Sequence, residues 1–71
     1  MTTLSDLTPR ELEILKLVLV GHSNKVIALE ISVSVKTVEF HLDHIYTKIG
    51  ARTRLMAAMW ALQNGLTDVE S

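Results

Sequence analysis

Apolar residues recur along this chain at the spacing of one helix face. The clearest run follows Ser34, where Val38, Leu42, Ile45 and Ile49 stand at i, i+4, i+7 and i+11. Such spacing gives a helix one buried face, and serine is a preferred residue for capping a helix start. The pattern predicts a helix over residues 35–49. Its opposite face would carry Lys36, Phe40, Asp43 and Thr47.

Strong boundary signals predict another helix over residues 9–20. Thr8 stands at the cap position, Pro9 takes the first helical position, and Glu11 can complete a capping box with Thr8. Gly21 comes directly after the last apolar residue, as glycine often does just past a helix. The inner stripe of this helix would consist of Ile14, Leu15 and Val18.

Two shorter helices complete the predicted fold. Ser23 can cap one over residues 24–31, and Thr53 can cap one over residues 54–64 that stops at Gly65. No segment alternates with period two between turn signals, so no sheet is expected. The fold class is therefore all-α, with one four-helix domain over residues 4–66. Residues 67–71 are predicted to fray as a C-terminal tail.

The middle of the chain has the layout of a helix-turn-helix. The short second helix, with an inner face of Ile27, Ala28 and Ile31, leads through a tight turn at residues 32–34 into the long third helix. Ala28 is small and allows the two helices to approach closely. This motif, over about residues 24–43, offers its second helix to the major groove of DNA. Residues 35–49 are therefore the candidate recognition helix.

Charge supports a nucleic-acid partner only weakly. The chain has a net charge of −1, although phosphate contacts depend on lysine and arginine. Residues 23–54 carry five basic and three acidic side chains, so the candidate motif is mildly basic inside an acidic chain. The chain has no cysteine, which excludes disulfides and cysteine-based zinc sites and fits a reducing cytoplasm. It also has no apolar run of about 18 residues for a membrane span and no signal peptide.

The fourth predicted helix is apolar on all sides. Ala58, Ala61 and Leu62 can serve the core, which leaves an apolar surplus on the rest of the helix. Such a surplus predicts a two-fold dimer, the commonest symmetric assembly. A thicker core, or packing against a neighbouring domain, is the alternative. The predicted dimer interface consists of Leu55, Met56, Met59 and Gln63.

The combination of motifs resembles the LuxR/FixJ-type (GerE-type) helix-turn-helix domain of bacterial transcriptional regulators, over about residues 4–66. The motifs that carry the resemblance are Leu7-Thr8-Pro9-Arg10-Glu11, Ser23-Asn24-Lys25, Ile27-Ala28, Ser34-Val35-Lys36-Thr37-Val38, His41, Lys48-Ile49-Gly50 and Arg52-Thr53-Arg54. The resemblance implies a cytoplasmic domain that binds double-stranded DNA and dimerises through its last helix. It also implies an N-terminal regulatory domain outside this chain, as in response regulators, and allows contact with RNA polymerase.

The resemblance assigns roles to residues on and around the third helix. Ser34, Lys36 and Thr37, at its N-terminal end, would clamp a phosphate. Further backbone contacts would come from Lys25, Lys48, Arg52 and Arg54, and from His44.

Three residues would face the floor of the groove, namely Glu39, Phe40 and Asp43. A carboxylate can accept a hydrogen bond from cytosine N4, and a phenyl ring can pack on a thymine methyl. Alternatively, the carboxylates are solvated or pair locally, as Glu39 could with Lys36.

A protein-interaction module, a metal site and an enzyme are the alternatives to DNA reading. The fold could serve as a protein-interaction module that binds DNA weakly or not at all because of Glu39 and Asp43. His41 and His44 stand one helical turn apart, but no third metal ligand is evident, so a core-edge role for His41 is preferred and no metal or other cofactor is predicted. No catalytic set or phosphate-binding loop occurs in the chain, so no enzyme is expected.

Overall fold

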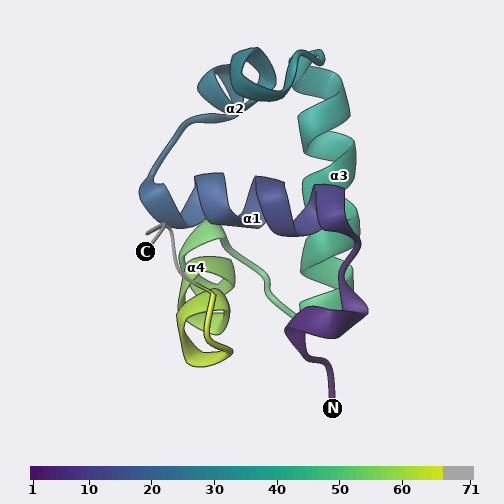
Figure 1. Ribbon diagram of the computed structural model, residues 1–71, viewed down its shortest axis with the longest axis vertical. Helices are drawn as coiled ribbons and strands as arrows, with labels where there is room; N and C mark the ends of the chain where they lie inside the picture. Colours follow the sequence, from purple (N-terminus) through teal and green to yellow (C-terminus); the bar gives the residue numbers. More distant parts are fainter. Residues whose placement is uncertain (67–71) are drawn as a thin grey trace.

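The computed structural model describes residues 1–66 and contains four α-helices, preceded by a 3₁₀ turn over Leu4–Asp6 (Figure 1). The helices are α1 (Pro9–Val20), α2 (Asn24–Ile31), α3 (Val35–Ile49) and α4 (Arg54–Gln63). There is no strand in this part of the chain. The predicted all-α class is confirmed, and the predicted helix bounds agree except at the end of α4, where Asn64 is the C-cap. The predicted tail, residues 67–71, lies outside the described residues.

Each helix begins where a side-chain hydroxyl accepts a backbone hydrogen bond. Thr8, Ser23, Ser34 and Thr53 accept from the N–H three residues further on. α1 and α3 end at glycines with positive φ, as Gly21 does at 101°. α2 ends at Ser32, a non-glycine residue with a φ of 59°. This left-handed residue makes the tight turn of the helix-turn-helix motif.

The core is aliphatic and lies where the four helices meet. The largest fully buried side chains are Ile14, Leu15, Ile27, Val38 and Ile45. α1 packs against both α3 and α4, and α2 packs against α3. In Figure 1, α2 and α4 lie on opposite sides of α1, and α3 runs beside all of them. The predicted inner faces of α1, α2 and α3 are confirmed, with Ile49 only half-buried at the edge.

The inner face of α4 differs from the sequence prediction. Ala57 and Ala61 are the buried residues of this helix, and Ala58 is half-buried. Leu62 was expected in the core but is 62% exposed. Ala57 and Ala61 stand four residues apart and share the helix face that meets the core. Leu62 is the next residue after Ala61, so its side chain points away from that face.

No helix in the described part of the chain is long and apolar enough to span a membrane.

Candidate nucleic-acid interface

The N-terminal end of α3 is an open helix start. The hydroxyl of Ser34 accepts the Thr37 N–H at 3.1 Å and lies 3.0 Å from the Thr37 hydroxyl. The first backbone N–H groups of a helix, here those of Val35 and Lys36, have no acceptor within the helix. Lys36 is exposed beside them. Free N–H groups, the positive end of the helix dipole and a lysine together favour an anion such as phosphate.

The outer face of α3 carries the three predicted base-reading residues. Glu39, Phe40 and Asp43 are all exposed. The two ion pairs within residues 1–66 are Arg10–Glu13 and Glu11–Lys48. Neither carboxylate on this face is therefore neutralised by an ion pair in the described structure, and the predicted alternative pairing of Glu39 with Lys36 is absent there.

Phe40 contacts the imidazole rings of two histidines. The ring centroids of Phe40 and His44 lie 4.4 Å apart, and those of Phe40 and His41 lie 5.9 Å apart in an edge arrangement. Such geometries are favourable for aromatic pairs. Phe40 is still 60% exposed, so much of the ring remains accessible despite these contacts. His41 is half-buried at the edge of the core and His44 is exposed, as the sequence predicted.

Lys48 forms an ion pair with another residue of the domain. Its ammonium lies 2.7 Å from Oε1 of Glu11 on α1, and Glu11 is the one charged residue in the core of the described structure. The same Glu11 oxygen accepts the Thr8 N–H at 2.9 Å, so one carboxylate both caps α1 and binds α3. The carbonyl of Lys48 also accepts the Thr2 hydroxyl. The sequence identified the cap but not this pair, because its partners are 37 residues apart.

The pKa of Glu11 reflects this arrangement. Burial by itself would raise the pKa, because it penalises the charged carboxylate. Hydrogen bonds from Lys48 and from the Thr8 backbone, together with the positive charge of Lys48, outweigh burial. The pKa of Glu11 is therefore held below its ordinary value, and the carboxylate is charged at neutral pH.

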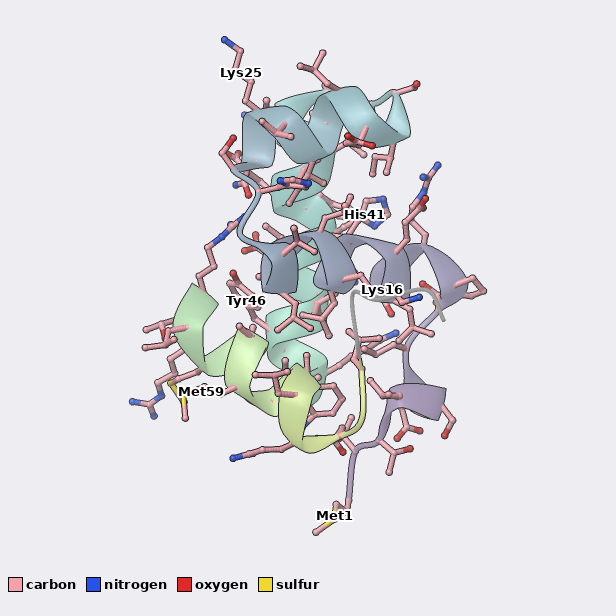
Figure 2. The ribbon with its side chains drawn as sticks, turned by 60° about the vertical axis from the view of Figure 1, so that its left-hand side comes forward. Met1, Lys16, Lys25, His41, Tyr46 and Met59 are labelled. Atoms are coloured by element: carbon pink, nitrogen blue, oxygen red, sulfur yellow. The ribbon has the colours of Figure 1, made fainter. Side chains whose placement is uncertain are left out.

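Arg54 also forms hydrogen bonds to other residues of the domain. Its Nη1 donates to Oδ1 of Asn24 at 2.8 Å, and its Nη2 donates to the backbone carbonyl of His22. Of the remaining predicted phosphate contacts, Lys25 and Arg52 are exposed and have no ion pair in the described part of the chain. Figure 2 shows Lys25 extending from α2 away from the body of the domain. The cations left free near the recognition helix are thus Lys25, Lys36 and Arg52.

The outer face of α4 is apolar and exposed. Leu55, Met59 and Leu62 form a stripe along it, with exposed fractions of 70%, 50% and 62%. Beside this stripe is a hollow of about 230 Å³ at the junction of α3 and α4. Figure 2 shows Met59 pointing outward from α4. The residues lining the hollow are Ile49, Gly50, Ala51, Met56, Met59, Trp60 and Gln63.

Residues 5–61 match the GerE family, described as bacterial regulatory proteins of the luxR family. The chain belongs to the LuxR family. The predicted resemblance is confirmed, and the family is one of regulators rather than enzymes. Within residues 1–66, no group of three or more His, Asp or Glu side chains could hold a metal ion.

Particular relatives of this LuxR-family domain include regulators and a structure with DNA. The chain is 47% identical over 62 residues to the oxygen regulatory protein NreC of Staphylococcus aureus, covering 87% of this chain and 29% of NreC. A VqmA–ligand–DNA complex from Vibrio cholerae superposes with a TM-score of 0.84 at 34% identity, covering 99% of this chain and 30% of VqmA. A VqmA dimer without target DNA gives a TM-score of 0.83 at 36% identity, covering 90% of this chain and 28% of VqmA. The chain spans less than a third of each relative.

Proposed function

We propose that this LuxR-family domain is the DNA-binding part of a transcriptional regulator, with α3 in the major groove. The observation that carries the proposal is the outer side of α3, where an open helix start and Lys36 stand directly before an exposed row of side chains. A phosphate at the helix start would set the register of the helix in the groove. The similarity to VqmA, whose complex with DNA is known, supports the same assignment.

The proposed base readers are Glu39, Phe40 and Asp43. The carboxylates of Glu39 and Asp43 have no ion pair in the described structure and can accept hydrogen bonds from cytosine N4. The exposed ring of Phe40, which contacts His44, can pack on a thymine methyl. Backbone contacts would come from Lys25, Lys36 and Arg52, which are the free cations, and His44 could add one more. Lys48 and Arg54, which bind Glu11 and Asn24 within the domain, would stabilise the fold instead of contacting phosphates.

A two-fold dimer through α4 is the second part of the proposal. The exposed stripe of Leu55, Met59 and Leu62, with the neighbouring hollow at Met56 and Gln63, offers an apolar surface that a second copy would cover. The three free cations near the recognition helix supply few phosphate contacts, so two domains on two half-sites would hold DNA much better than one.

Selection of bound duplexes from a random DNA library, repeated at several salt concentrations, tests the proposal. We expect enrichment of a two-fold-related site, and affinity that falls steeply as salt rises. Glu39→Ala and Asp43→Ala should each relax the preference for one base pair while the salt dependence is kept. If both variants keep the sequence preference and only bind more tightly, the carboxylates do not read bases.

A protein-interaction module remains the second candidate. The observation that favours it is the pair of exposed carboxylates, Glu39 and Asp43, on a face with few free cations. In that case no DNA sequence would be enriched at any salt concentration, and the apolar outer face of α4 would bind a partner protein.

A further inference from the structure

Arg54 connects two helices, α2 and α4, that are not among the closely packed helix pairs of the fold. It is the first residue of α4, and its guanidinium donates to Asn24, the first residue of α2, and to the carbonyl of His22 just before α2. Both figures show α2 and α4 on opposite sides of α1. The side chain therefore joins the helix proposed for dimerisation to the first helix of the helix-turn-helix motif.

The charge of Arg54 is unfavourable for both helices by itself. A cation near the N-terminus of a helix opposes the helix dipole, and this guanidinium lies at the start of α4 and beside the start of α2. Its two acceptors, an amide oxygen and a carbonyl oxygen, offset this cost through charge-assisted hydrogen bonds. The fork geometry of arginine suits two acceptors of this kind, whereas lysine presents a point charge.

The apolar packing of α4 gives this connection its importance. The buried residues within α4 are Ala57 and Ala61, and Trp60 packs partly buried against the core beside them. The two alanines bury little apolar area compared with larger side chains. The bidentate polar link of Arg54 adds a directional restraint at the first residue of α4, which these apolar contacts lack.

We propose that Arg54 is a positioning residue that sets the distance between the two recognition helices of the dimer. The proposal rests on the DNA-binding dimer described above. In a two-fold dimer the α4 pair lies at the axis, so movement of α4 relative to α2 and α3 changes the separation of the two α3 helices. Half-site spacing on DNA mirrors that separation. Loss of the link should therefore broaden the range of spacings that the dimer accepts.

The test uses the full chain and a set of duplexes that differ only in the number of base pairs between the two half-sites. We expect the unaltered protein to prefer one spacing clearly. In Arg54→Gln, the preference over spacings one base pair longer or shorter should fall at least threefold. Asn24→Ala and Arg54→Lys, which each leave one of the two hydrogen bonds, should lower the preference by a smaller but measurable factor. The salt dependence of binding should stay unchanged in all three variants, because no phosphate contact is lost.

Lys36→Ala is the matched control. It removes a proposed phosphate contact, so it should reduce the salt dependence by about one phosphate and leave the spacing preference intact. If Arg54→Gln behaves in the same way, Arg54 binds phosphate and the proposal is wrong.

Asn24→Ala keeps the charge of Arg54 and places a strong helix former at the start of α2, so it remains informative even if Arg54→Gln fails to fold. A folded Asn24→Ala variant with an unchanged spacing preference would overturn the proposal. If the unaltered protein binds no duplex, the proposed function itself fails, and the positioning role fails with it.

Discussion

The Glu11–Lys48 pair should stabilise the fold by an amount that can be worked out from its geometry. Glu11→Gln keeps the shape of the side chain and an oxygen for the Thr8 N–H, but removes the charge that faces Lys48 at 2.7 Å. The Glu11 side chain is 7% exposed and that of Lys48 is 37% exposed. Breaking a fully buried pair costs about 3–5 kcal/mol, and an exposed pair contributes about 0.2–1 kcal/mol. For this half-buried pair we expect a loss of about 1–2 kcal/mol.

Urea unfolding followed by circular dichroism measures this loss at fixed protein concentration, which matters because dimerisation would add to the apparent stability. The expected loss corresponds to a fall of roughly 5–15 °C in Tm for a domain of this size. Lys48→Met completes a double-mutant cycle, in which the two residues should be coupled by about 1 kcal/mol. Lys25→Met, at an exposed lysine with no ion pair in the described structure, is the control and should change stability by less than about 0.5 kcal/mol.

The pH dependence gives an independent check. Because the pKa of Glu11 is lowered in the folded state, its stabilising contribution is complete above the ordinary carboxyl pKa of about 4.3. The contribution is lost as the pH falls through the lower pKa of the folded protein. The difference in unfolding free energy between the unaltered protein and Glu11→Gln should therefore be constant near neutral pH and shrink in acid. A difference that does not change between neutral and acid pH, or a coupling energy near zero, would refute the reasoning.

Three further results are expected. Ile45→Ala should lower the free energy of unfolding by about 2–5 kcal/mol in urea titrations, because Ile45 is completely buried; a loss below 1 kcal/mol would contradict the packing described. Ser34→Ala should cost about 0.5–2 kcal/mol in the same assay through loss of the α3 cap, and a nearby Ser32→Ala without that loss shows that the cap is responsible. In DNA titrations, Lys36→Ala should reduce the slope of log affinity against log salt by about 0.9, whereas Lys48→Ala should leave the slope unchanged in the folded protein; equal effects would mean that Lys48 leaves Glu11 to bind phosphate.

Local signals in the sequence were enough to predict most of the helices. Capping residues such as Thr8 and Ser34, and the terminal glycine Gly21, act over three or four residues, so they can be recognised without knowledge of the fold. The 3₁₀ turn at the N-terminus was missed, although its capping pair, Thr3 and Asp6, has the same spacing as the pair that opens α1. That signal was present in the sequence and would have indicated a turn.

The rotation of α4 could not be predicted in the same way. A helix that is apolar on all sides has no polar face to mark its outside, so nothing in the pattern distinguishes Ala57 from Leu62. The choice depends on which face fits closely against α1, and this is a property of the packed structure. The fourth helix was therefore predicted with nearly correct bounds and with Ala61 correctly in the core, but Leu62 was wrongly placed there and Ala57 was missed.

The sequence predicted which residues of α3 are exposed at the candidate site, but not the hydrogen-bond partners of its basic residues. The exposed row on α3 follows from helical periodicity, and its exposure agrees with the prediction. The partners of Lys48 and Arg54 lie 37 and 30 residues away, and only the folded chain brings them together. Both residues were predicted as phosphate contacts because they are basic and lie near the recognition helix, and no local pattern indicates that each also has a partner within the domain.

The alanine face of α4 has a consequence for how such domains can diverge. The inner contacts of α4 come from Ala57, Ala61 and the partly buried Trp60. The exposed side chains at Leu55, Met59 and Leu62 can therefore be exchanged without disturbing the core. A cell that contains several related regulators needs each one to pair with its own copies, and such specificity requires features that reject the wrong partner. In the dimer proposed above, substitutions on this exposed stripe would therefore change the pairing preference while α3 stays the same.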